Sequence, residues 1–182
     1  MSDGFSADWL ALREPYDHAA RADALTGRLA AWLAREAAGR PVRIVDLGCG
    51  TGSNLRYLSP RLRVPQAWSL VDHDADLLAQ VPAMPGLETV RADLSGPLDA
   101  LPIQAAALVT GSALLDLVSD DWLARLAAAL HLHALLAAVD LHLRVGVQLL
   151  QGALDGGLAV AAGHAGDGEL LLHGGSPRWA VG

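Results

Sequence analysis

The chain has 182 residues and a mass of 18.9 kDa, which fits one domain around a single core. Its net charge is −7 and every basic residue is an arginine, a balance that disfavours binding to nucleic acid. The single cysteine excludes an internal disulfide and fits a reducing compartment. The start of the chain lacks a signal-peptide pattern, and polar residues interrupt its apolar runs. We therefore expect a cytoplasmic protein that does not span a membrane.

Two helices are predicted at the N-terminus, over residues 8–14 and 17–38. Asp8 is the expected N-cap of the first helix, and Pro15 separates the two. The second helix has a one-sided apolar stripe formed by Leu25, Leu29, Trp32 and Leu33. Gly39 is expected to end it.

Strands and helices then alternate along the chain. Strands are expected at residues 42–47, 67–71, 87–91 and 105–110. Helices are expected at residues 53–62 and 121–130, and a short helix is expected to begin after Asp74, its N-cap. This alternation predicts parallel strands joined by right-handed crossovers. Further along, residues 135–143 are the expected fifth strand, and residues 158–162 and 169–172 a final hairpin.

A glycine-rich turn follows the first expected strand and opens the next helix. The segment Val-Asp-Leu-Gly-Cys-Gly-Thr-Gly-Ser-Asn places Gly48, Gly50 and Gly52 in a G-x-G-x-G pattern. This differs from the G-x-G-x-x-G of dinucleotide enzymes, whose glycines pack beneath a pyrophosphate. Three alternating glycines let the backbone approach a ligand without a phosphate, and Asp46 can neutralise a cationic amino group.

This segment closely resembles motif I of the class I S-adenosylmethionine-dependent methyltransferases. The resemblance covers about residues 20–130 and implies a Rossmann-like α/β fold, a parallel sheet with helices on both faces. It implies S-adenosyl-L-methionine as the cofactor and no metal. We expect residues 1–38 to form helices that cover the cofactor site and residues 39–182 to form the α/β domain, with a shortened or irregular C-terminal part.

The resemblance also implies roles for residues that follow the later strands. Asp72 would accept both ribose hydroxyls, while His73 would cover the adenine edge or point away. Asp93 would accept the adenine amino group, and the backbone N–H of Leu94 would bind a ring nitrogen. Ser112 would contact the cofactor through its backbone.

Three further residues are candidates with less specific signals. Asp116 lies where many relatives carry histidine, so it is the candidate catalytic residue, to orient or deprotonate the acceptor or attract the sulfonium; a helix cap is the alternative. Tyr16 and Arg21 would close the pocket or hold the methionine carboxylate. The full expected cofactor-binding set is Tyr16, Arg21, Asp46, Gly48, Cys49, Gly50, Gly52, Asn54, Asp72, His73, Asp93, Leu94 and Ser112.

The predicted function is methyl transfer to a small-molecule acceptor, with no nucleic-acid partner. The resemblance fades after about residue 130, so the alternative is a non-catalytic protein that binds the cofactor or its demethylated product, S-adenosylhomocysteine. Such a protein would be a truncated or frame-shifted methyltransferase. A nicotinamide-dependent oxidoreductase is the other alternative, and the glycine spacing disfavours it.

Overall fold

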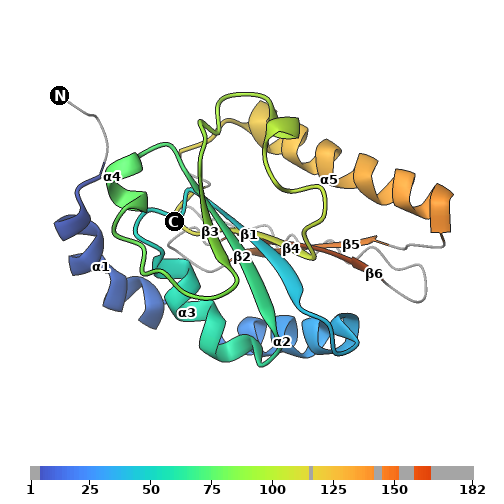
Figure 1. Cartoon of the computed structure of the whole chain (residues 1–182), viewed down its shortest axis with the longest axis horizontal. Coiled ribbons are helices and arrows are strands. Elements are labelled where there is room, and N and C mark those ends of the chain that lie inside the picture. Colours follow the sequence, from blue (N-terminus) through green and yellow to red (C-terminus); the bar gives the residue numbers. More distant parts are fainter. Residues whose placement is uncertain (1–4, 115–116, 142–144, 152–157, 165–182) are drawn as a thin grey trace, which may run out of the picture.

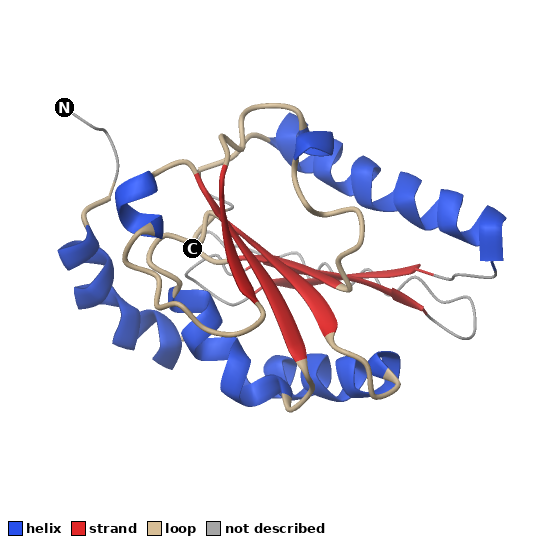
Figure 2. Cartoon of the chain, in the orientation of Figure 1, coloured by secondary structure: helices blue, strands red, loops and turns tan. Residues whose placement is uncertain are grey.

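The computed structural model describes residues 5–114, 117–141, 145–151 and 158–164, which form one sheet with helices on both faces (Figures 1 and 2). The strands run in the order β3-β2-β1-β4-β6-β5. They are β1 (Val42–Leu47), β2 (Gln66–Asp72), β3 (Leu87–Arg91), β4 (Leu108–Gly111), β5 (Val145–Gln151) and β6 (Leu158–His164). The helices are α1 (Ala7–Ala19), α2 (Asp23–Ala37), α3 (Ser53–Leu62), α4 (Ala75–Leu78), the 3-10 helix η1 (Leu98–Ala100) and α5 (Asp120–Leu141).

The first four strands are parallel, as the alternating pattern predicts. β1 pairs with β2 from Val42 opposite Gln66 to Leu47 opposite Val71, and it pairs on its other side with β4. β3 joins the outer side of β2 in the same direction. The loops that follow these strands therefore share one edge of the sheet. α1 and α4 lie at this edge (Figure 1). The Rossmann-like arrangement is confirmed.

Side chains of successive β1 residues enter two separate core layers. Ile44 packs with α2 and α3 on one face of the sheet, whereas Val45 and Leu47 pack with η1 and α5 on the other. This alternation is the period of two that a strand imposes. Because both faces of β1 are covered, five of its six residues are buried.

The N-terminal helices differ from the prediction. α1 continues through Pro15 rather than ending before it, and Ser6 caps the helix in place of Asp8 by accepting a hydrogen bond from the backbone N–H of Trp9. A proline removes one backbone hydrogen bond from a helix. Side-chain contacts on both sides of Pro15 hold α1 against α3: Glu14 pairs with Arg56, and His18 contacts Ser53.

The C-terminal prediction is wrong in part: the strand expected at residues 158–162 is present as β6, but the expected fifth strand is not. Most of residues 135–143, the expected fifth strand, belongs to α5, which extends to Leu141. This stretch is rich in Ala and Leu and contains no Gly or Pro, so helix propensity favours continuing α5. The position beside β4 is taken by the antiparallel strand β6, whose hairpin partner is β5 rather than residues 169–172, which lie outside the described residues. The sheet is therefore mixed.

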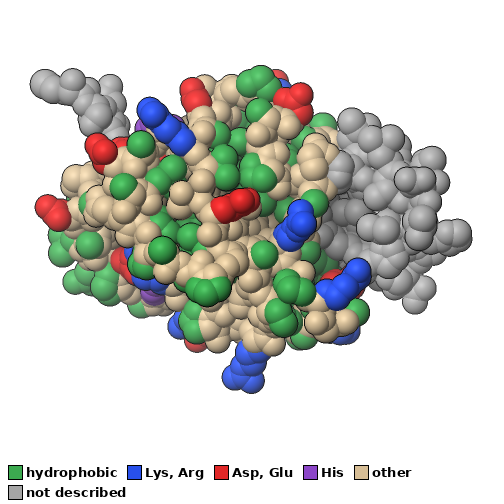
Figure 3. Space-filling view, in the orientation of Figure 1, with side chains coloured by type: hydrophobic (Ala, Val, Ile, Leu, Met, Phe, Trp, Pro, Cys, Tyr) green, Lys and Arg blue, Asp and Glu red, His purple; other side chains and the backbone are tan. Residues whose placement is uncertain are grey.

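The other expected elements lie close to their predicted positions. The strands at 42–47 and 87–91 and the helix at 53–62 are confirmed, and Asp74 caps α4 through the backbone N–H groups of Asp76 and Leu77. β4 begins at Leu108, three residues later than expected. Within the described ranges, no helix has the length and apolar character needed to cross a bilayer. On the face drawn in Figure 3, arginine and carboxylate side chains lie singly among apolar ones.

Candidate functional site

The glycine turn between β1 and α3 has a backbone that only glycine adopts freely. Gly48, Gly50 and Gly52 have φ angles of +66°, +54° and +86°. Two backbone hydrogen bonds fix the turn: the Cys49 N–H donates to the carbonyl of Val71 at 3.0 Å, and the Gly52 N–H donates to the carbonyl of Cys49 at 2.9 Å. The first of these joins the turn directly to the end of β2.

A cavity of about 640 Å³ lies against this turn. Its lining includes Gly48, Cys49, Gly50, Asn54, Asp72, His73, Asp93, Leu94 and Ser112 from the predicted set. The strand-end order brings these residues together, because the loops after β1, β2, β3 and β4 share one edge of the sheet. The volume falls within the range of small-molecule sites, about 300–1,000 Å³.

Asp72 connects the end of β2 to the glycine turn. Its Oδ2 accepts a hydrogen bond from the Gly50 N–H at 2.8 Å, and its Oδ1 accepts one from the Asp74 N–H at 3.0 Å. The His73 Nδ1 lies 3.3 Å from the same Oδ1. A carboxylate has about four acceptor sites, so these contacts do not saturate Asp72. The side chain is nearly buried yet lines the cavity.

Asp93 and Leu94 form the cavity wall beyond β3. The Ser95 N–H donates to Oδ1 of Asp93 at 2.8 Å, and hydrogen bonding from Ser95 holds the pKa of Asp93 below its usual value. The Leu94 carbonyl accepts a hydrogen bond from the indole N–H of Trp122 on α5. These contacts keep Asp93 ionised and fix the backbone next to it.

Asp46 does not line the cavity, and its expected contact with a ligand stays a prediction. Alternation along β1 turns its side chain toward the α3 face, where it is fully buried. Asn54, from the first turn of α3, donates from Nδ2 to Asp46 Oδ1 at 2.8 Å and to Thr110 Oγ1 at 3.1 Å. Within the described structure, Asp46 Oδ2 has no hydrogen-bond partner. Asn54 therefore lies between Asp46 and the cavity.

Burial raises the pKa of Asp46 to about 7, against the opposing effects of the Asn54 hydrogen bond and the Arg21 charge. The carboxyl is protonated in both the folded and unfolded states below about pH 4. As the pH rises to 7, the folded state retains the proton longer, so the free energy of unfolding falls.

Asp46→Asn is expected to remove this pH dependence, because asparagine cannot ionise and still offers Asn54 an acceptor. As the pH rises from 4 to 8, the free energy of unfolding of the variant should increase by roughly 1–4 kcal/mol relative to that of the natural chain. Urea unfolding at both pH values measures the change, and the other titrating groups cancel in the comparison. Parallel stability profiles for the two proteins would contradict the buried, protonated state of Asp46.

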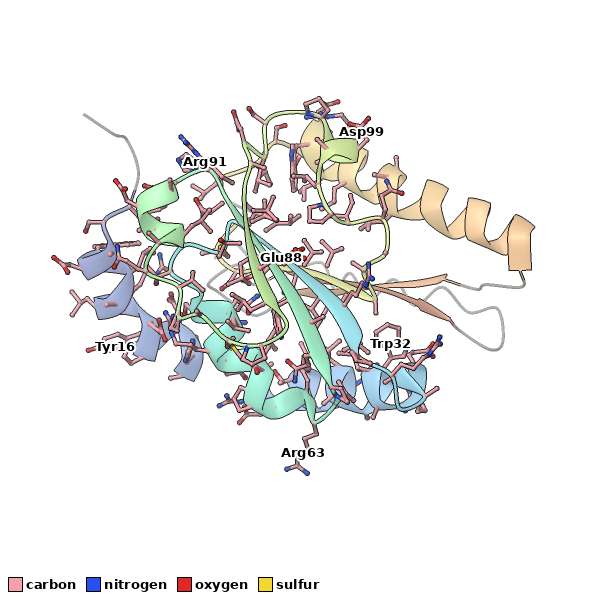
Figure 4. All side chains as sticks on the ribbon, viewed as in Figure 1. Tyr16, Trp32, Arg63, Glu88, Arg91 and Asp99 are labelled. Atoms are coloured by element: carbon pink, nitrogen blue, oxygen red, sulfur yellow. The ribbon has the colours of Figure 1, made fainter. Side chains whose placement is uncertain are left out.

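Arg21, Tyr16 and Gly52 also lie outside the cavity lining. The Arg21 guanidinium donates to Asn54 Oδ1 at 2.7 Å and to Ser112 Oγ at 2.6 Å, so it joins the N-terminal segment to α3 and the end of β4. Tyr16 is 75% exposed and points away from the sheet (Figure 4), because the packed face of α1 carries Leu10, Glu14 and His18 instead. Gly52 faces Leu70. Asp116 lies outside the described residues, and its role stays a prediction.

Polar contacts that the sequence analysis missed attach α1 to the glycine turn. Arg56 donates to both oxygens of Glu14 and to the carbonyl of Thr51 within the turn. The Arg56 hydrogen bond holds the pKa of Glu14 below its usual value. His18 Nε2 lies 3.1 Å from the carbonyl of Ser53. α1 has no buried residue of its own, so these contacts and Leu10 against Gly50 hold it in place.

Two groups of lining residues were not in the predicted set, although residues 1–38 were expected to cover the site. Phe5, Trp9, Leu10, Arg13 and Asp17 come from α1 and the residue before its cap, and Leu114, Leu117, Val118, Ser119, Trp122 and Arg125 come from the segment after β4. The helical spacing of Trp9, Arg13 and Asp17 is the signal that places them on one side of α1. Trp122 is buried and also lines the cavity.

Neither a family model nor a curated protein sequence matches the chain. Solved structures of methyltransferases match the chain at TM-scores below 0.5. The match to the plantazolicin methyltransferase BpumL with a monoazolic desmethylPZN analog and SAH has 13% identity and a TM-score of 0.38, and covers 64% of this chain and 57% of that one. BpumL with SAH gives 11% identity, a TM-score of 0.41 and coverage of 87% and 88%. The match to SAH-bound PaMTH1 from Podospora anserina has 15% identity and a TM-score of 0.39, and covers 88% of this chain and 90% of that one.

Proposed function

We propose that the chain binds S-adenosylmethionine at the carboxyl ends of β1 to β4 and transfers its methyl group to a small-molecule acceptor. The observation that carries this proposal is the joint placement of the glycine turn, Asp72 and Asp93 in one cavity. The turn allows a ligand to approach the backbone closely, Asp72 ends β2, and Asp93 follows β3. These groups suit an adenosine whose 5′ position carries a sulfonium rather than a phosphate.

The charge of the lining suits a cationic ligand. Carboxylates of Asp17, Asp72, Asp74 and Asp93 line the cavity, against the guanidinium groups of Arg13 and Arg125. The Arg13 guanidinium is itself paired with Asp17 through contacts of 2.7 and 3.0 Å. A sulfonium is favoured in such a site, whereas a pyrophosphate would meet several carboxylates and unfavourable electrostatics.

Some residues would hold the nucleoside, and others fix the structure behind the glycine turn. Asp72 would accept the ribose hydroxyls with its remaining lone pairs, and Asp93 with the Leu94 backbone would bind the adenine. The Asp46–Asn54–Arg21 network lies behind the glycine turn and fixes the orientation of Asn54. Arg21 thus acts through Asn54 and Ser112 rather than by direct contact with a carboxylate.

S-adenosylmethionine supplies a methyl group already activated by its positive sulfur. The acceptor atom forms a bond to that methyl as the carbon–sulfur bond breaks, the sulfur keeps the electron pair, and the acceptor's proton passes to solvent. The protein contributes position: the acceptor must lie in line, about 3 Å from the methyl. A general base would add roughly 10²–10⁴-fold for an acceptor that must lose a proton, and Asp116 is the candidate.

Titration calorimetry with S-adenosylmethionine, S-adenosylhomocysteine and NAD tests the proposal. We expect both adenosyl sulfur compounds to bind with the same stoichiometry and NAD to show no saturable heat. Methyl transfer is then sought with radiolabelled cofactor and a set of small acceptors. Binding without transfer to any acceptor would favour the non-catalytic alternative, and preferential binding of NAD would overturn the proposal.

A further inference from the structure

Phe5 and Trp9 form a stacked aromatic pair at the cavity. Their ring centroids are 4.7 Å apart and their planes differ by 12°. Phe5 is 48% exposed and Trp9 is 41% exposed, although both line the cavity. Phe5 is also the one phenylalanine in the sequence. Exposed aromatic rings beside a cavity are typical of surfaces that bind an apolar or aromatic partner.

A second apolar wall comes from the segment after β4 and the start of α5. Leu117 lines the cavity at 60% exposure, together with Leu114, Val118 and Trp122. The indole N–H of Trp122 is already used by the Leu94 carbonyl, so this residue offers a ligand its ring rather than a hydrogen bond. The two apolar walls thus derive from segments about 110 residues apart in the chain.

Both walls meet at the glycine turn. A Cβ added at Gly50 would lie 3.1 Å from Leu10 Cδ1, and one added at Gly48 would lie 3.3 Å from Leu114 Cδ1. The apolar part of the cavity therefore borders the turn directly. An acceptor must lie within about 3 Å of the transferred methyl group, so the space beside the turn is where it would bind.

The charged groups along these walls already have partners. The Arg13 guanidinium lies 4.7 Å from the Trp9 ring and forms a two-point ion pair with Asp17. Arg125 lies 3.3 Å from an Asp121 carboxylate oxygen. An ionised acceptor would have to lose its hydration and displace one of these pairs, which is unfavourable. A neutral one would not.

We propose that the acceptor is a flat, uncharged aromatic molecule that binds between the α1 wall (Phe5, Trp9 and Leu10) and the wall formed by Leu114, Leu117 and Trp122. The inference rests on the proposed function, because it places this acceptor beside the methyl group of a bound cofactor. It adds the chemical class of the acceptor, which the sequence motifs do not specify.

Three probes test this class on the full chain saturated with S-adenosylhomocysteine. 2-Naphthol is flat and neutral at pH 7, 2-naphthoate adds a negative charge, and trans-2-decalol is a saturated analogue of the naphthol. Calorimetry should show 2-naphthol binding roughly three- to tenfold tighter than either of the others, the scale expected for aromatic contacts. Trp9→Leu, also measured at saturating S-adenosylhomocysteine, should bring the 2-naphthol affinity close to that of decalol.

Tyr16→Leu is the matched control, since it removes an exposed ring from the same helix but outside the cavity lining. It should leave the affinity for all three probes unchanged. If S-adenosylhomocysteine binds but 2-naphthoate binds tightest, or if Trp9→Leu has no more effect than Tyr16→Leu, the acceptor class is wrong while the proposed function stands. If S-adenosylhomocysteine itself does not bind, the proposed function fails and this inference fails with it.

Discussion

Asp72→Asn is expected to weaken S-adenosylmethionine binding by roughly 2–4 kcal/mol. The substitution keeps the size of the side chain but replaces one acceptor oxygen with an NH₂ group. An NH₂ group only donates, so it can accept neither the Gly50 N–H, now 2.8 Å from Oδ2, nor a ribose hydroxyl. The loss therefore combines an unpaired ribose group with a less ordered glycine turn. Isothermal titration calorimetry gives the affinity directly.

Two comparisons separate these contributions. An S-adenosylhomocysteine analogue without ribose hydroxyls should lose less affinity on Asp72→Asn than the natural compound, and the remaining loss reports the effect on the turn. Asp76→Asn is the matched control, because Asp76 is an exposed carboxylate on α4 outside the cavity lining. Equal affinities in the natural chain and in Asp72→Asn would show that β2 does not contribute the nucleoside contact.

The strand-end loops could be predicted from the sequence because their signals are local. An apolar run followed by alternating glycines specifies a strand, a turn with positive φ and a helix, and the structure confirms each of them between Val42 and Leu62. Parallel order then brings the loops after β1, β2 and β3 to one edge without further information. This is why Gly50, Asp72 and Asp93 were expected together and do line one cavity.

The side-chain partners could not be predicted in the same way. Arg21 contacts Ser112 across 91 residues, and Arg56 contacts Glu14 across 42. Many acidic or hydroxyl side chains in the sequence could accept a hydrogen bond from either arginine, and only tertiary packing selects among them. Asp46 illustrates a related limit: its place in the motif suggested a ligand contact, whereas the pleat of β1 turns it to the α3 face.

The segment after residue 130 shows the limit of pattern recognition in a biased composition. A run of Ala and Leu can form either a buried strand or a buried helix, because its apolar residues do not show one period. In the structure it extends α5, and the pairing partner of β4 comes from Leu158–His164 instead. That antiparallel pairing depends on a hairpin with β5, whose register no local signal specified.

Gly50→Val is expected to destabilise the glycine turn by roughly 2–4 kcal/mol and to weaken cofactor binding at least about tenfold. Gly50 has φ of +54°, a conformation that a β-branched residue strongly resists. The added Cβ would also lie 3.1 Å from Leu10 Cδ1. The side chain would therefore press on Leu10 of α1, which itself lines the cavity. Urea unfolding and S-adenosylhomocysteine titration measure the two effects.

A short series of variants distinguishes backbone strain from crowding. Gly50→Ala retains the strain with less bulk, and Leu10→Ala removes the atom that the new side chain would meet. If crowding contributes, Gly50→Val combined with Leu10→Ala should be less destabilised than the sum of the single variants. Gly27→Ala is the matched control, because Gly27 lies in α2 with negative φ and open space around its Cβ position, so alanine should be neutral or slightly stabilising there. A Gly50→Val protein with natural stability and affinity would show that the turn tolerates a side chain, and the close backbone approach on which the proposed cofactor site depends would then be wrong.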